Sequence, residues 1–189
     1  MSKAWFSSDF HFNHTNICGP RISSWSSGYR NFNSLSYMND CIIDNLNSKI
    51  MPEDILYFLG DFAFGDKSQI PTLRERIKCR EIHLIYGNHD DSIRKNKDYR
   101  YLFASDRDCA LIKVNGQELY LNHYPTDVWV NNHRHTYHCF GHVHNNFQHC
   151  NGQRMDVGVD TNNFMPYSLD EVVSICKAKI PFLPDHHTS

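Results

Sequence analysis

Apolar residues follow two alternating patterns along the first half of the chain. Largely apolar runs at residues 4–7, 54–59 and 82–86 predict buried strands, because each run is short and is bounded by glycine, proline or polar residues. Between the runs, apolar residues recur at three- and four-residue steps over 35–50 and 70–77, which predicts amphipathic helices. This strand–helix–strand–helix–strand order predicts a parallel sheet with helices packed on it.

The polar residues between these elements indicate where the helices begin and end. Asn33 or Ser34 can cap the first helix, Pro52 ends it, and Ser68 can cap the second. Residues 12–34 are rich in Asn, Ser and Gly and predict a long loop. A loop of this length in a compact domain is more often functional than idle.

The pattern changes after about residue 105. Apolar runs at 109–114 and 118–121 flank Asn115-Gly116, a strong hairpin signal that predicts an antiparallel second half. Three further elements are predicted: a strand at 137–140, a strand at 154–159 and a final helix at 169–177 that Ser168 can cap. We therefore expect a mixed α/β domain over residues 1–180 and a disordered tail at 181–189.

Composition narrows the class of protein. The chain has 189 residues, of which 40% are hydrophobic, and this suits one globular domain with a sizeable core. A net charge of -2 gives no overall positive field for nucleic acid. Seven scattered cysteines without a Cys-x-x-Cys pair predict reduced thiols. The sequence shows no signal peptide and no apolar run near the roughly 18 residues of a membrane span, so we expect a cytoplasmic protein.

Thirteen histidines stand out, and several of them follow predicted strands. In sheets of this type, ligands bind at the carboxyl ends of the strands, so side chains that follow the strands are expected to share one crevice. Five such clusters occur in chain order: Asp9 and His11, then Asp61, then Asn88 and His89, then Asn122 and His123, and finally His142 and His144.

The number of these donors predicts two metal ions. Two carboxylates, one amide and four histidines exceed the four ligands of a tetrahedral zinc, with His89 left over. They suit two ions about 3.5–4 Å apart that share a bridging carboxylate. Mixed nitrogen and oxygen ligands favour borderline or hard first-row ions. Water bound to such ions has a pKa near 7, so this site is suited to hydrolysing phosphate esters.

The ordered motifs Asp-x-His, Gly-Asp, Gly-Asn-His-Asp, a lone His after a strand and Gly-His-x-His resemble the calcineurin-like metallophosphoesterases. They span residues 9–144. Flanking segments such as Asn122-His123-Tyr124-Pro125 and Val157-Gly158-Val159-Asp160 are similar to small single-domain members from bacteria and bacteriophages. The resemblance implies a β-sandwich flanked by helices, a metal site at the strand ends and hydrolysis of phosphoesters, often with Mn²⁺. Fe, Zn, Ni, Co and Mg remain alternatives.

The resemblance also implies a role for each residue. Asp9, His11 and His144 would hold the first ion, Asp61 would bridge, and Asn88, His123 and His142 would complete the second. His89 would protonate the leaving group or stabilise the transferring phosphoryl group, and Asn88 would help to stabilise the pentavalent charge. Substrate contacts are expected from His14, Arg21 and Arg30, and either Asp66 or Asp90 is expected to orient His89.

The substrate is less closely defined by the sequence. There is no large inserted cap domain, and the polar loops at 12–34 and 124–137 are expected to leave the site open, which favours a nucleotide-like or small phosphodiester. A phosphomonoesterase and a metal-dependent nuclease are alternatives, although a nuclease would need a basic track that the net charge of -2 does not suggest. A non-catalytic metal-binding module is a further alternative, and the oligomeric state is open.

Overall fold

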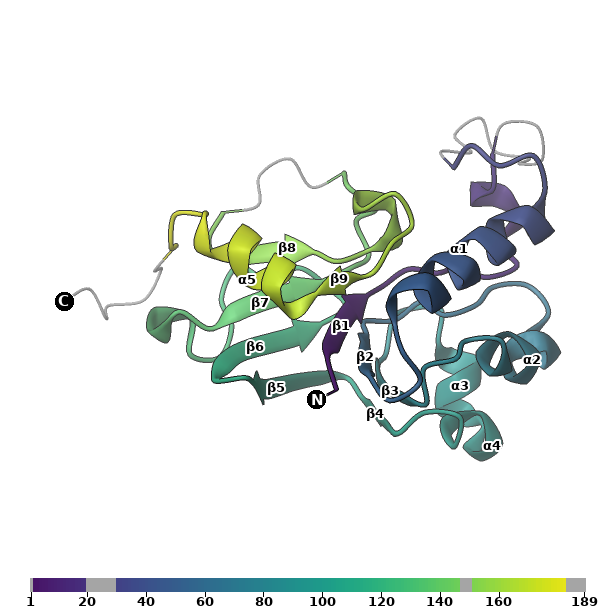
Figure 1. Cartoon of the computed structure of the whole chain (residues 1–189), viewed down its shortest axis with the longest axis horizontal. Helices are drawn as coiled ribbons and strands as arrows, with labels where there is room; N and C mark the ends of the chain where they lie inside the picture. The colour runs from purple at the N-terminus through teal and green to yellow at the C-terminus, as the bar shows by residue number, and fades with distance from the viewer. Residues whose placement is uncertain (1, 20–29, 147–150, 183–189) are drawn as a thin grey trace.

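Two β-sheets form the centre of the protein in a computed structural model that describes residues 2–19, 30–146 and 151–182 (Figure 1). The first sheet has the order β4-β3-β2-β1-β9 and the second the order β5-β6-β7-β8. The first sheet consists of β1 (Ala4–Ser7), β2 (Ile55–Phe58), β3 (Glu81–Ile85), β4 (Ser105–Arg107) and β9 (Tyr167–Ser168). The second consists of β5 (Cys109–Val114), β6 (Gln117–Asn122), β7 (Tyr137–Phe140) and β8 (Arg154–Asp156).

Strands β1 to β4 of the first sheet are parallel, as the order of the sequence elements predicts. Only β9 runs antiparallel, beside β1. Because Ser7 of β1 pairs with Phe58 of β2, and Phe58 with Leu84 of β3, these three strands end at nearly the same level. The residues that follow them are therefore brought to one edge of the sheet.

Five α-helices flank the sheets within the described residues (Figure 1). They are α1 (Leu35–Lys49), α2 (Ile70–Glu75), α3 (Asp91–Lys95), α4 (Lys97–Arg100) and α5 (Leu169–Lys177). Ser34 caps α1 by accepting a hydrogen bond from the Tyr37 amide, and Ser168 forms a capping box with Glu171 on α5, so both predicted caps are confirmed.

The predicted cap of the second helix is wrong. Ser68 lies inside a 3₁₀ turn, η2 (Lys67–Gln69), that precedes α2, and its amide donates to the side chain of Asp66. Asp66 therefore caps this turn, because an aspartate two residues ahead of an amide can form the Asx turn that a serine inside the turn cannot. The described part of the chain has three other 3₁₀ turns, η1 (Thr15–Ile17), η3 (Asn132–Arg134) and η4 (Val159–Thr161).

The second sheet begins with the predicted hairpin but is not wholly antiparallel. β5 and β6 pair antiparallel around Asn115 and Gly116, whereas β6, β7 and β8 are mutually parallel. This corrects the prediction of an antiparallel second half. The chain between the end of β6 at Asn122 and the start of β7 at Tyr137 is long enough for a crossover, and such a connection permits parallel pairing.

Alternating side chains of the first sheet divide the apolar core in two. Ala4 and Phe6 point towards Leu119 and Leu121 of the second sheet, so the two sheets form a sandwich. Trp5 points to the other face, where a larger cluster joins the sheet to Met38, Ile42 and Leu46 of α1 and to Ile70 and Leu73 of α2. The predicted α/β sandwich flanked by helices is thus observed.

Several short elements differ from the sequence prediction. β8 ends at Asp156 and not at residue 159, because the Asp156 carboxylate accepts a hydrogen bond from the Gly158 amide and the chain then enters η4. The helices α3 and α4 and the strands β4 and β9 are too short to give a periodic signal. No helix in the described residues is long and apolar enough to cross a membrane. The tail at 183–189 lies outside the described residues.

Candidate metal centre

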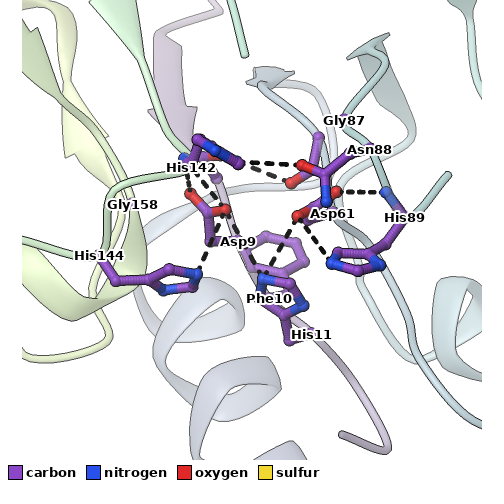
Figure 2. Close-up of polar contacts among 12 residues, drawn as sticks. Asp9, Phe10, His11, Asp61, Gly87, Asn88, His89, His142, His144 and Gly158 are labelled. Atoms are coloured by element: carbon purple, nitrogen blue, oxygen red, sulfur yellow. Dashed lines mark hydrogen bonds and ion pairs between the residues drawn. The ribbon is translucent and has the colours of Figure 1, made fainter. Parts of the chain in front are cut away.

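The predicted ligand residues lie in the loops that follow five strands and meet at one edge of the sandwich. Asp9, Asp61 and Asn88 each come two or three residues after β1, β2 and β3. In the second sheet, His123 follows β6 and His142 follows β7. Figure 2 shows the two aspartates side by side, with imidazole rings around them.

Hydrogen bonds between these loops join the ends of the two sheets. The Gly141 amide donates to the His123 carbonyl at 2.9 Å, which aligns the loops after β6 and β7. The His142 amide donates to the Asp9 carboxylate at 3.0 Å, and His123 Nδ1 lies 2.7 Å from the Leu59 carbonyl. The loops are therefore fixed to one another before any ligand binds.

Backbone strain is concentrated in the ligand residues. Asp9, His11, Asp61, His142 and His144 all have φ between 48° and 72°. A residue with a Cβ rarely adopts this left-handed region, and strain of this kind clusters at functional sites. The strained backbone turns each side chain towards the centre instead of continuing the direction of its strand.

Two glycines allow the carboxylates to sit close to the neighbouring loops. A Cβ added to Gly87 would lie 2.2 Å from Asp61 Oδ1, and one added to Gly141 would lie 2.4 Å from Asp9 Oδ2. Any larger residue at either position would overlap a carboxylate. The glycine of each motif therefore has a steric reason, which the sequence alone does not reveal.

The first group of donors is built from Asp9, His11 and His144, with Asp61 beside them. His11 Nε2 lies 3.7 Å from Asp9 Oδ1 and 3.4 Å from Asp61 Oδ2, and His144 Nε2 lies 3.9 Å from Asp9 Oδ1. These separations are too long for hydrogen bonds, but they resemble the roughly 3–3.5 Å between ligand atoms that each sit about 2.1 Å from one ion.

His11 gives a direct test of whether a cation fits here. Its ring is buried, and neither ring nitrogen has a hydrogen-bond partner among the described residues. Burial lowers the pKa of His11 to about 3, so the ring is neutral and keeps a lone pair. A buried lone pair without a partner is costly, and a divalent cation between His11 and the two carboxylates would satisfy it.

The second group contains Asp61, Asn88, His123 and His142. Asn88 Oδ1 lies 3.1 Å from His123 Nε2 and 3.0 Å from His142 Nδ1, and His123 Nε2 lies 3.6 Å from Asp61 Oδ2. The bond from His123 Nδ1 to the Leu59 carbonyl places the proton on Nδ1 and leaves Nε2 as the donor atom. Four donor atoms thus converge on one point.

Asp61 belongs to both groups through a single atom. Its Oδ2 lies near His11 Nε2, His123 Nε2 and His89 Nε2, at 3.4, 3.6 and 4.0 Å. Burial, with help from the negative charge of Asp9, raises the pKa of Asp61 to about 7. Concentrated negative charge of this kind needs nearby cations, and this oxygen is placed to touch two of them.

Comparison with known proteins agrees with this geometry. Residues 38–157, well over half of the chain, match the model of the calcineurin-like phosphoesterase superfamily domain. The chain belongs to this superfamily. The matched range includes Asp61, His89 and His144, and it begins after β1 and the loop that carries Asp9 and His11. Membership implies divalent metal ions, and the groups described above are candidates to bind them.

Similar proteins include relatives that the chain matches over nearly their whole length. An uncharacterized protein of Methanocaldococcus jannaschii is 30% identical over 93% of this chain and 92% of its own length. A protein of unknown function from Aquifex aeolicus has a solved structure with a TM-score of 0.70 and 26% identity, covering 93% of this chain and 100% of its own. A structure described as a novel archaeal phosphodiesterase shares the fold, with a TM-score of 0.51 and 14% identity over 82% and 83% of the two chains.

His89 and His14 lie beside the candidate metal centre, where both rings contact Phe64. The His89 amide donates to Asp61 Oδ1 at 2.8 Å, and its ring meets the edge of Phe64 and lies near His11. His14 stacks on Phe64 with ring centroids 4.0 Å apart and is buried. Burial lowers the pKa of His14 to about 4 and also lowers that of His89. The two histidines thus share one aromatic support.

The prediction that either Asp66 or Asp90 orients the His89 ring is wrong. Asp90 does not orient the His89 ring, because its carboxylate accepts hydrogen bonds from the amides of Asp61, Phe62 and Gly87. It joins the loop after β2 to the loop after β3. Asp66, the other candidate, caps η2.

The prediction that Arg30 clamps a substrate phosphate is also wrong. Its side chain is 1% exposed and donates to the Asp160 carboxylate and to the carbonyls of Asp9 and Phe10. No donor is left for a substrate. Arg21, the other candidate arginine, lies outside the described residues.

Asp160 is a residue of this site that the sequence reasoning gave no role. Its Oδ2 lies 2.7 Å from His144 Nδ1, which leaves Nε2 of that ring facing Asp9. Burial lowers the pKa of His144, but the hydrogen bond to Asp160 and the charges of Asp9 and Asp160 together raise it. No local pattern marks Asp160, because it approaches His144 only through the folded loop after β8.

Proposed function

We propose that this protein is a dinuclear metal-dependent phosphoester hydrolase that prefers small phosphodiesters. The observation that carries this proposal is the position of Asp61 Oδ2, which is shared between two complete groups of nitrogen and oxygen donors. A single ion would leave the donors of one group unsatisfied, including the buried ring of either His11 or His123.

The donors divide between two ions as follows. Asp9, His11 and His144 would hold the first, Asn88, His123 and His142 the second, and Asp61 would bridge them. When bound, the two ions would supply a water of lowered pKa and polarise the phosphoryl oxygens. Donors of this kind suit Mn²⁺, and Fe, Zn, Ni, Co and Mg are alternatives.

The remaining residues act on the phosphoryl group and on the leaving group. The Asn88 side chain, held by His123 and His142, can donate its amide N–H groups to a phosphoryl oxygen. The His89 ring is half-buried and lies 4.0 Å from Asp61 Oδ2, so it faces the same centre. From there it can protonate the departing alcohol oxygen.

A cavity beside the second group supports a substrate with two ester arms. It has a volume of about 450 Å³ and begins at Gly87 and Asn88, with Tyr86, Tyr124 and Arg94 among its lining residues. This volume lies within the range that holds small-molecule ligands. A monoester leaving its alcohol towards His89 would not need this space, whereas the second arm of a diester would occupy it.

The charges around the cavity favour a small diester over a polynucleotide. Arg94 is the only basic residue in the described lining, and it forms an ion pair with Asp108. A nuclease tracks several phosphates with a basic groove, and its binding depends steeply on salt. The overall charge of -2 agrees with the small substrate.

The experiment combines elemental analysis with two chromogenic substrates. Purified protein loaded with Mn²⁺ should contain two ions per chain and hydrolyse bis-p-nitrophenyl phosphate faster than p-nitrophenyl phosphate. Asp61→Ala should lose activity on both substrates, because each ion loses its shared ligand. Full activity of Asp61→Ala would contradict the proposal.

The rivals give different results in the same assays. Degradation of single-stranded DNA or RNA that falls steeply with salt would favour a nuclease. Faster hydrolysis of the monoester would favour a phosphatase. Stoichiometric metal binding without hydrolysis of any ester would favour a binding module.

A further inference from the structure

Arg30 uses every hydrogen-bond donor of its guanidinium group inside the protein. Nε and Nη2 each lie 2.8 Å from one oxygen of Asp160, which makes a bidentate pair. Nη2 also donates to the Asp9 carbonyl at 2.7 Å, and Nη1 donates to the Phe10 carbonyl at 2.9 Å and contacts Met38 Sδ at 3.9 Å. Five N–H groups thus meet five acceptors.

These acceptors belong to two segments that are far apart in the sequence but serve the same metal position. The carbonyls of Asp9 and Phe10 lie in the turn after β1, where Asp9 has a φ of 60°. The Asp160 carboxylate contacts His144 Nδ1 on its other side. One guanidinium therefore connects the backbone of one first-group ligand to the imidazole of another.

We infer that Arg30 and Asp160 are positioning residues that set the affinity of the first metal position. Arg30 holds the left-handed turn of Asp9, and it orients the Asp160 carboxylate, which in turn fixes the proton of His144 on Nδ1. Each contact directs a donor atom at the space between Asp9 and His144. Carboxylate partners of a ligating imidazole typically change metal affinity by about 10–100-fold.

The second position lacks this support. His123 is fixed by the Leu59 carbonyl, and the Asn88 amide oxygen lies between His123 and His142. None of the hydrogen bonds of Arg30 or Asp160 given above reaches these three residues. Loss of the Arg30–Asp160 pair should therefore weaken one position selectively. This inference rests on the proposed two-ion site, and its test measures metal binding and not only hydrolysis.

The test isolates each position by removing a ligand from the other. His142→Ala leaves the first position, and His144→Ala leaves the second. Co²⁺ alone is titrated into each metal-free variant by calorimetry, with the visible absorption of bound Co²⁺ as a second signal. Adding Arg30→Lys or Asp160→Asn should weaken binding about 10–100-fold in the His142→Ala background and less than about threefold in the His144→Ala background.

Lysine is an informative replacement for Arg30 because it keeps the positive charge but lacks the planar guanidinium group that contacts Asp160 and the two carbonyls. Arg74 provides the matched control. It is also a buried arginine, and its partners among the described residues are the carbonyls of Leu102, Ile77 and Arg80. Arg74→Lys should lower thermal stability without changing the Co²⁺ affinity of either position.

Two outcomes would overturn the inference. One is equal weakening in both backgrounds, which would mean a general structural role. The other is unchanged affinity of the first position in Arg30→Lys protein that is folded by circular dichroism. Failure of the proposed function looks different, because wild-type protein would then bind two ions and hydrolyse no phosphoester, while the binding comparison would remain measurable.

Discussion

The two proposed metal positions share Asp61 but are built in different ways. At the first position Asp9 and His11 are buried, at 0% and 3% exposed, and His144 is partly buried. Buried Arg30 and partly buried Asp160 support these ligands. At the second position only His123 is buried, whereas Asn88 and His142 are exposed and Asn88 lines the adjoining cavity. The first position therefore resembles part of the core, and the second part of a binding surface.

This difference in burial suggests different roles for the two proposed metal positions. Ligand side chains that are already held by hydrogen bonds lose little conformational freedom when a metal ion binds, because their geometry is already set. An exposed set beside a cavity leaves room for substrate to approach the ion it holds. We expect the first position to retain its ion and the second to be the side where substrate binds.

The largest effect is expected from His89, which lies beside the shared Asp61. His89→Gln should lower kcat by roughly 10²–10⁴-fold while two ions remain bound, because no metal ligand is removed. If His89 protonates the leaving group, the loss should be larger for a methyl p-nitrophenyl diester cleaved at the alkyl side than for release of p-nitrophenol. The measurement is kcat for both bonds, with metal content by elemental analysis. An equal loss for both bonds would instead indicate that His89 stabilises the phosphoryl group.

The next effect concerns ion retention. The two ions should differ in affinity on the order of 10–100-fold. A chelator should therefore remove one of them first from wild-type protein, and this should be the ion held by His142 and Asn88. His142→Ala should then bind one ion tightly, and His144→Ala one ion weakly. Competition with a chromogenic chelator measures both constants. Equal affinities in the two variants would remove the distinction drawn between the positions.

Much of this comparison could be predicted from the sequence, because the ligands follow apolar runs directly. Asp61 comes after one buried strand and Asn88 after the next, and parallel strands bring their ends together. The ligand groups could therefore be predicted from the residues that follow each strand, together with the rule that parallel strands end at the same edge of a sheet. The helix caps at Ser34 and Ser168 were equally local.

The support behind the first position could not be predicted, because it depends on contacts between distant segments. Arg30 lies in a polar stretch, where an arginine is usually hydrated, and only the fold shows that it is buried against Asp160. The parallel order of β6 to β8 was missed for a similar reason. The hairpin at Asn115 and Gly116 specifies one pairing and gives no information about strands joined by long connections.

A smaller effect tests the shared carboxylate in metal-free protein. The pKa of Asp61, about 7, lies above the ordinary value of 3.8, so the fold favours the neutral carboxyl. The stability that this preference contributes is present below about pH 4 and is lost as the pH rises through 7. Asp61→Asn stays neutral and should stabilise metal-free protein at pH 8 by at most about 4 kcal/mol, with no gain at pH 4.

Thermal melts of chelator-treated protein at the two pH values measure this difference. Asp98→Asn, at an exposed position on α4, serves as the control and should change the melting temperature little. With Mn²⁺ present the order should reverse, because asparagine is a poorer bridge than a carboxylate. If metal-free Asp61→Asn protein melts at a lower temperature than wild type at pH 8, the carboxylate charge does not destabilise the metal-free protein.

The smallest effect is expected at the cavity beside the second position. Arg94 stacks on Tyr86, 4.0 Å from its ring centroid, and is paired with Asp108, so only part of its charge is available to a diester. Arg94→Gln should raise KM for bis-p-nitrophenyl phosphate about 2- to 5-fold and leave KM for the monoester unchanged. Arg100→Gln is the matched control, since Arg100 is also paired with an aspartate but does not line this cavity. A similar rise for both substrates would place the second ester arm elsewhere, whereas a selective rise would identify the exposed position as the side that binds the diester.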